Sequence, residues 1–157
     1  MAVVTPVFLD TSVLLAGLID LGPANAEAQR VMDAIAEGRI RRVQTGWHCC
    51  LEFYAVSTRL PPELRLAPSD ALRLVETEIL SRFELCQLPV RDIGTFLGAA
   101  ARERVAGGRI YDAHIAEIAR LAGARTVVTD NRRHFTSLMR HGIRVLSTEE
   151  FASEMAR

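Results

Sequence analysis

Apolar and polar positions alternate along this chain in segments of two kinds, short β-branched runs and longer segments with helical spacing. The β-branched runs predict buried strands, because strands covered on both faces of a parallel sheet are almost continuously apolar. The expected strands are Val3 to Leu9, Arg42 to Thr45, Phe83 to Leu88, Thr126 to Thr129 and Ile143 to Leu146.

The segments between these strands carry apolar residues three and four positions apart, which is typical of amphipathic helices. Ser12 can cap the first helix and Asn25 the second, since short polar side chains at these points accept backbone N–H groups. The expected helices are 13–16, 26–36, 47–59, 69–80, 90–106, 111–121 and one that begins at 148. Strands that alternate with helices predict a single α/β domain over residues 1–157, with a mainly parallel sheet in a three-layer α/β/α sandwich.

Four carboxylates occupy places where a fold normally has aliphatic or hydroxyl side chains. Asp10 and Asp130 each end a predicted strand, and Glu52 and Asp112 lie early in predicted helices. An ionised carboxylate that leaves water without a partner is costly, so such groups are normally paired or bind metal. Because ligands of open parallel sheets bind outside the carboxyl ends of the strands, we expect the four acids to converge there on a divalent cation.

Each of these carboxylates also has an ordinary structural interpretation. Asp10 and Asp112 could cap helices, and Asp130 with Asn131 could form a turn. Glu52 could lie on a solvated helix face. Their joint placement in four separate segments favours the shared site over these separate roles.

The four segments that contain the acids resemble the signature segments of PIN domains, in order and spacing over nearly the whole chain. They are Leu-Asp-Thr-Ser at 9–12, Leu-Glu-Phe-Tyr-Ala at 51–55, Ile-Tyr-Asp-Ala-His-Ile-Ala at 110–116, and 127–135. In particular they resemble the toxin ribonucleases of bacterial VapBC toxin–antitoxin pairs. The resemblance implies a PIN-like fold with a five-stranded sheet and a metal-dependent endoribonuclease that hydrolyses RNA phosphodiester bonds.

By position, the resemblance implies that Asp10, Glu52 and Asp112 are three acids of the family's catalytic metal site. Asp130 is expected to be the fourth. Family members vary between acid and amide after the fourth strand, so Asn131 is the alternative for this position, as an oxygen ligand or a substrate contact.

Weaker candidates surround these acids. Thr11 and Ser12 match the family's hydroxyl positions and could orient Asp10 or a metal-bound water, and Arg132, Arg133 and Arg140 flank the site as candidate phosphate contacts. His114, two positions after Asp112, is expected to face another side of its helix and to be structural.

The expected cofactor is Mg2+ or Mn2+. Such an ion lowers the pKa of bound water and stabilises charge on phosphoryl oxygens, which are the two demands of phosphodiester hydrolysis. Because Mg2+ prefers oxygen ligands and keeps several waters, a few carboxylates suffice.

Composition changes this picture little. Nineteen basic residues, all of them Arg, balance nineteen acidic ones, so no overall positive charge indicates nucleic acid and phosphate contacts must be local. The three cysteines lack the spacing of a structural zinc site. No apolar run is long enough to span a bilayer and the N-terminus lacks a signal pattern, so no membrane association and a cytoplasmic protein are expected.

The resemblance implies RNA as substrate, an antitoxin protein that packs near the acids as inhibitor, and a homodimer. Apolar helix residues offer more surface than one sheet obviously covers: Leu51, Phe53, Tyr54, Val56, Leu72, Val75 and Ile79. Two alternatives stay open, a PIN-type nuclease in RNA processing outside a toxin pair and a non-catalytic PIN-like RNA-binding module. A neighbouring antitoxin gene would separate the toxin from the first, and a metal-dependent ribonuclease assay would separate the enzyme from the second.

Overall fold

The computed structural model describes residues 3–157 and is built around a five-stranded sheet whose strands are all parallel. The strands are β1 (Val7–Leu9), β2 (Val43–Gly46), β3 (Glu84–Cys86), β4 (Thr126–Val128) and β5 (Arg144–Leu146). They lie in the order β3-β2-β1-β4-β5. The predicted parallel five-stranded sheet is confirmed.

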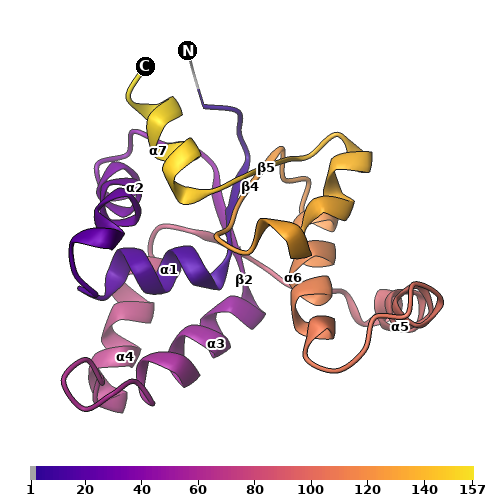
Figure 1. Cartoon of the computed structure of the whole chain (residues 1–157), viewed down its shortest axis with the longest axis horizontal. Helices are drawn as coiled ribbons and strands as arrows, with labels where there is room; N and C mark the ends of the chain where they lie inside the picture. Colours follow the sequence, from indigo (N-terminus) through magenta and orange to yellow (C-terminus); the bar gives the residue numbers. More distant parts are fainter. Residues whose placement is uncertain (1–2) are drawn as a thin grey trace.

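Helices cover both faces of this sheet, which confirms the three-layer sandwich. Figure 1 shows α1, α2 and α7 on one side of the strands and α5 and α6 on the other. The helices are α1 (Thr11–Leu18), α2 (Ala26–Ala36), α3 (Trp47–Ser57), α4 (Pro68–Leu74), α5 (Ile93–Arg102), α6 (Arg109–Leu121) and α7 (Thr148–Met155). Short 3-10 helices are η1 (Pro23–Asn25), η3 (Val90–Asp92), η4 (Arg132–His134) and η5 (Thr136–His141), and η2 (Val75–Leu80) is a π-helix that continues α4.

The first strand and the first helix differ from their predicted bounds. β1 begins at Val7, four residues later than expected, because Pro6 has no N–H with which to extend the ladder. α1 is capped by Asp10, whose side chain accepts the Thr11 N–H, so the assignment of this cap to Ser12 was wrong. Asp10 is therefore a helix cap as well as a site candidate.

Two other helix starts are also informative. Asn25 precedes α2 as predicted, but its side chain makes no capping hydrogen bond. α7 begins with a capping box in which Ser147 Oγ accepts the Glu150 N–H and Glu150 Oε2 accepts the Ser147 N–H. This box fixes the N-terminus of α7 beside the loop that follows β4.

The strand order reverses between β1 and β4, and this reversal positions the site. The chain runs outward from β1 through β2 to β3 and then returns to the other side of β1 with β4 and β5. The register pairs Leu9 with Val128, so the residues that follow the two strands are neighbours at one edge of the sheet. Ligands of open α/β sheets bind at such a point.

Large apolar side chains in the core set the orientation of the elements around this edge. Phe53 in α3, Ile115 in α6 and Phe135 after η4 are fully buried. Glu52 directly precedes Phe53, and His134 directly precedes Phe135. Because the two phenylalanines are anchored in the core, Glu52 and His134 are directed toward the rim of the sheet. Within residues 3–157, none of the helices combines the length and the apolar character needed to cross a membrane.

Candidate active site

Asp10 is the most buried carboxylate of the site, with 2% of its surface exposed. Its Oδ1 accepts the Thr11 N–H at 2.7 Å, and its Oδ2 accepts the hydroxyls of Ser12 at 3.0 Å and Thr129 at 2.8 Å. Burial raises the pKa of Asp10 to about 6, although these hydrogen bonds oppose the rise. Among residues 3–157 no basic side chain forms an ion pair with it. A cation bound here would offset the cost of burying this charge.

Glu52 is connected to Asp10 through Thr11. The Thr11 hydroxyl donates to Glu52 Oε1 at 2.9 Å, while the Thr11 N–H donates to Asp10. His48 Nε2 lies 3.4 Å from the same Glu52 oxygen, one helical turn earlier in α3. Burial raises the pKa of Glu52, the Thr11 hydrogen bond lowers it, and the charge of Asp112 raises it further. Thr11 thus orients both acids, with its hydroxyl directed to Glu52 and not to Asp10.

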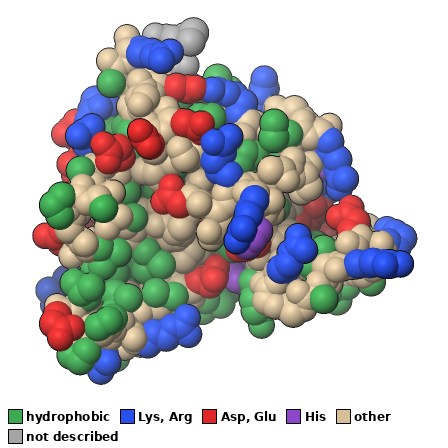
Figure 2. Space-filling model, viewed as in Figure 1, with side chains coloured by type: hydrophobic (Ala, Val, Ile, Leu, Met, Phe, Trp, Pro, Cys, Tyr) green, Lys and Arg blue, Asp and Glu red, His purple; other side chains and the backbone are tan. Residues whose placement is uncertain are grey.

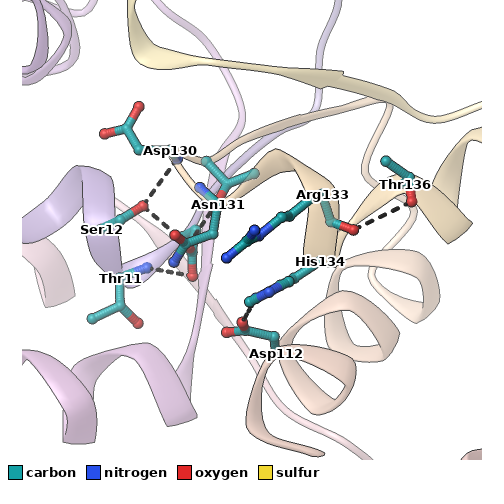
Figure 3. Close-up of polar contacts among 10 residues, drawn as sticks. Thr11, Ser12, Asp112, Asp130, Asn131, Arg133, His134 and Thr136 are labelled. Carbon is teal, nitrogen blue, oxygen red and sulfur yellow. Dashed lines mark hydrogen bonds and ion pairs between the residues drawn. The ribbon is translucent and has the colours of Figure 1, made fainter. Parts of the chain in front are cut away.

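Asp112 lies in the first turn of α6, where the helix dipole favours a negative charge. Its Oδ2 is 2.5 Å from Nδ1 of His134 (Figure 3). The charge of Asp112 contributes to the raised pKa of both Asp10 and Glu52. The negative charge of Asp112 therefore acts on both of the other acids.

The structure does not bring the carboxylate of Asp130 to the other three acids. Its Oδ1 accepts the Thr148 N–H at 3.2 Å, at the start of α7. Figure 3 shows this carboxylate pointing away from Asp112, whereas the side chain of Asn131 extends toward Thr11. Of the two residues predicted for the fourth position, Asn131 is the one directed into the site.

Of the weaker candidates, Ser12 contacts the acids and Arg132 does not. Ser12 donates to Asp10 and accepts the Asp130 N–H at 3.2 Å, so it connects the ends of β1 and β4. Arg132 is ion-paired with Glu150 of α7, its Nη1 2.9 Å from Oε1. This pair directs Arg132 away from the acids.

Histidines near the acids were missed by the sequence reasoning. His134 contacts Asp112, and His48 Nδ1 lies 2.8 Å from Nδ1 of His114, beside Glu52. Burial lowers the pKa of His48 and of His114. The contacts of His114 are with His48 and Phe96, so it belongs to a polar cluster that the sequence did not predict. The spacing of His48 four residues before Glu52 was the signal that could have revealed this neighbour.

The donor set fits a hard divalent cation. Asp10, Glu52 and Asp112 provide carboxylate oxygens, which Mg2+ and Mn2+ prefer. Across the described residues 3–157, no group of three or more His, Cys, Asp or Glu side chains is close enough to enclose a metal ion. An ion that keeps several of its waters needs few direct ligands, so these acids suit Mg2+ better than a fully protein-enclosed metal such as structural zinc.

Comparisons with known proteins agree with this architecture. The sequence model of the PIN domain matches residues 6–133. The chain is similar to ribonuclease VapC27 of Mycobacterium tuberculosis, with 32% identity over 127 residues, which is 81% of this chain and 86% of the relative.

Two solved structures have the same fold. PAE2754 from Pyrobaculum aerophilum superposes with a TM-score of 0.60 at 20% identity, covering 96% of each chain. VapBC2 from Rickettsia felis, bound to a DNA fragment from its promoter, superposes with a TM-score of 0.57 at 16% identity, covering 90% of this chain and 97% of the other. The chain therefore belongs to the PIN-domain family, among relatives named VapC ribonucleases, as its four acidic segments predicted.

Proposed function

We propose that this protein is a Mg2+- or Mn2+-dependent endoribonuclease that acts as the toxin of a toxin–antitoxin pair. The observation that carries the proposal is the buried Asp10, which has no basic partner within residues 3–157 and shares the strand-reversal edge with Glu52 and Asp112. Similarity to ribonuclease VapC27 supports RNA as the substrate. The site type and the family thus favour the same reaction.

In this proposal Asp10, Glu52 and Asp112 hold the cation and Asn131 is the fourth polar group. A bound Mg2+ or Mn2+ lowers the pKa of a coordinated water and stabilises charge on the phosphoryl oxygens. The hydroxyls of Ser12 and Thr129, donating to Asp10 Oδ2, hold the Asp10 carboxylate in one orientation.

His134 has a comparable positioning role. Its Nδ1 contacts Oδ2 of Asp112, which leaves the other Asp112 oxygen available to a ligand. Hydrogen bonds of this kind orient metal-binding carboxylates and raise the precision of the site.

The proposal predicts metal-dependent cleavage. Purified protein should cut single-stranded RNA with Mg2+ or Mn2+, and EDTA should abolish the activity because the acids alone cannot activate water. The same ions should stabilise the fold by about 2.7 kcal/mol at a hundredfold excess over Kd, measured by thermal unfolding. An Asp112→Asn preparation purified in parallel controls for contaminating ribonuclease. Undiminished cleavage in EDTA would sink the proposal, and RNA binding without cleavage would favour a non-catalytic module.

We also propose two protein partners, a second copy of this chain and an antitoxin. Apolar side chains gather over α3 and α4, at the lower left of Figure 2. Leu51, Tyr54 and Leu72 are 53%, 41% and 51% exposed. Of the apolar residues predicted for this surface, Phe53, Val75 and Ile79 are core residues and cannot contribute, because the sheet and helices bury them. The structural likeness to a VapBC assembly supports the antitoxin.

A charged residue in this apolar surface should prevent self-association. Sedimentation at micromolar concentration should show a dimer for the parent and a monomer for Leu51→Glu combined with Leu72→Glu. Met139→Glu, at an exposed apolar residue of η5, is the matched control and should leave the dimer intact. A parent protein that sediments as a monomer would refute the dimer without affecting the proposed chemistry.

A further inference from the structure

We propose that Arg133 binds the phosphate of the RNA at the acid site, and that the strand continues from there into the cavity between α5, α6 and η5. This inference rests on the proposed RNA cleavage and names a residue that recognises the substrate. Of the arginines expected to flank the acids, it selects Arg133 and not Arg132 as the phosphate contact.

Two adjacent arginines of η4 have opposite environments. Arg132 is ion-paired with Glu150 of α7. Arg133 has no ion pair with any acid within residues 3–157. Figure 3 shows its side chain extending in the same direction as that of His134, toward the space between Asn131 and Asp112. Its guanidinium is therefore free for bidentate contact with a phosphate.

The arrangement also explains why Arg133 does not simply pair with the acids. Asp112 already contacts His134 through Oδ2, and the oxygens of Asp10 are buried and accept hydrogen bonds from Thr11, Ser12 and Thr129. These oxygens already have hydrogen-bond partners, although the charge of Asp10 has no basic partner within residues 3–157, and Arg133 remains available to substrate.

The backbone that carries Arg133 is well anchored. Phe135 is fully buried two residues later, and the His134 N–H donates to the Asn131 carbonyl at 2.9 Å. The Thr136 hydroxyl contacts the Arg133 carbonyl at 3.4 Å. A rigid backbone lowers the entropy lost when the side chain binds a ligand.

The charge of the site requires such a group. Three carboxylates outweigh one divalent cation, so an entering phosphate would meet a net negative charge without a neighbouring base. A guanidinium beside the acids offsets this repulsion and stabilises the charge that develops on the phosphoryl oxygens.

A cavity of about 210 Å³ begins next to Arg133 and gives the strand a path. Arg133 and His134 are among its lining residues, and so are Arg109 and Arg140. Arg140 is paired with Glu103, whereas Arg109 has no ion pair within residues 3–157. Figure 2 shows basic side chains beside a histidine near the centre of this face. The cavity is small for a complete ligand site of roughly 300 Å³ or more, and suits a sugar and phosphate.

The test compares the parent with four variants that each replace one arginine with glutamine, and with Arg133→Lys, which keeps the charge. Arg133→Gln should lower kcat/KM for single-stranded RNA by about a hundredfold, the effect of removing one donor to a developing charge. Arg133→Lys should recover part of this loss, because lysine keeps the positive charge but cannot donate two parallel hydrogen bonds as a guanidinium does. Arg132→Gln should change kcat/KM much less, and Arg73→Gln, in α4, should not change it. Arg109→Gln should raise KM with kcat unchanged, as expected for a contact beyond the reacting phosphate.

Binding of fluorescently labelled RNA to the metal-free proteins in EDTA provides a second readout. Arg133→Gln should reduce the slope of log affinity against log salt by about one, whereas Arg132→Gln should keep the slope of the parent. If Arg133→Gln matches Arg132→Gln in both kcat/KM and salt slope, the inference is overturned. A parent that never cleaves RNA but binds it through Arg133 would instead contradict the proposed function and retain this inference.

Discussion

Replacing Asp112 with Asn should lower the rate of RNA cleavage by about three orders of magnitude, because several kcal/mol of metal catalysis depend on its charge. Asn keeps the shape of the side chain and one oxygen, so the fold should persist. The variant should even relieve repulsion, since the Asp112 charge raises the pKa of both Asp10 and Glu52. Initial rates in Mg2+ and unfolding curves in EDTA measure the two effects separately.

Asp130→Asn is the matched control for this prediction. It makes the same chemical change at an acid whose carboxylate accepts the Thr148 N–H, outside the group formed by the other three. It should therefore keep most of the activity, and cells that express it should stay growth-arrested while cells that express Asp112→Asn should grow. Equal losses in the two variants would place Asp130 among the metal ligands, and parent-level cleavage by Asp112→Asn would remove Asp112 from them.

The fold was predictable because its strands are short apolar runs separated by helices. Such a pattern has one common solution, a parallel sheet with helices on both faces. Element bounds depended on details that the pattern does not contain. Pro6 shortens β1, and the predicted helix over 69–80 divides into α4 and the π-helix Val75–Leu80.

The group of acids was predictable only in part, because the pattern locates backbones better than side chains. Asp10 and Asp130 each follow a strand at the reversal of strand order, so both backbones reach the same edge. The direction of a side chain in the turn after a strand depends on distant partners. Thr129 bonds Asp10, whereas Asp130 turns to Thr148, eighteen residues later. This difference separates the Asp130 carboxylate from that of Asp10.

The histidine contacts were not predictable for the same reason. His134 meets Asp112 across 22 residues, and His48 meets His114 across 66. Only packing of η4 against α6 and of α3 near α6 brings these side chains together. The free Arg133 likewise becomes distinct from Arg132 only once α7 places Glu150 beside the latter.

Asp10→Asn should make the metal-free protein more stable at neutral pH, by an amount that depends on pH. The pKa of Asp10 is about 6 in the fold against 3.8 ordinarily, chiefly because of burial. Between these values the folded state binds more protons than the unfolded state, so the free energy of unfolding falls as pH rises from about 4 to about 6. The full loss corresponds to about 3 kcal/mol. Asn carries no titrating charge and should avoid this loss.

Urea unfolding of both proteins in EDTA between pH 4 and pH 8 measures the effect. Other titrating groups are common to the two chains and largely cancel, so the stability of Asp10→Asn relative to the parent should rise by about 3 kcal/mol between pH 4 and pH 7 and then level off. At pH 7.5, Mg2+ should make the parent more stable than Asp10→Asn, because the ion stabilises only the protein that retains the carboxylate. Parallel pH profiles with no response to Mg2+ would show that Asp10 is an ordinary helix cap, for which Asn is an equivalent residue.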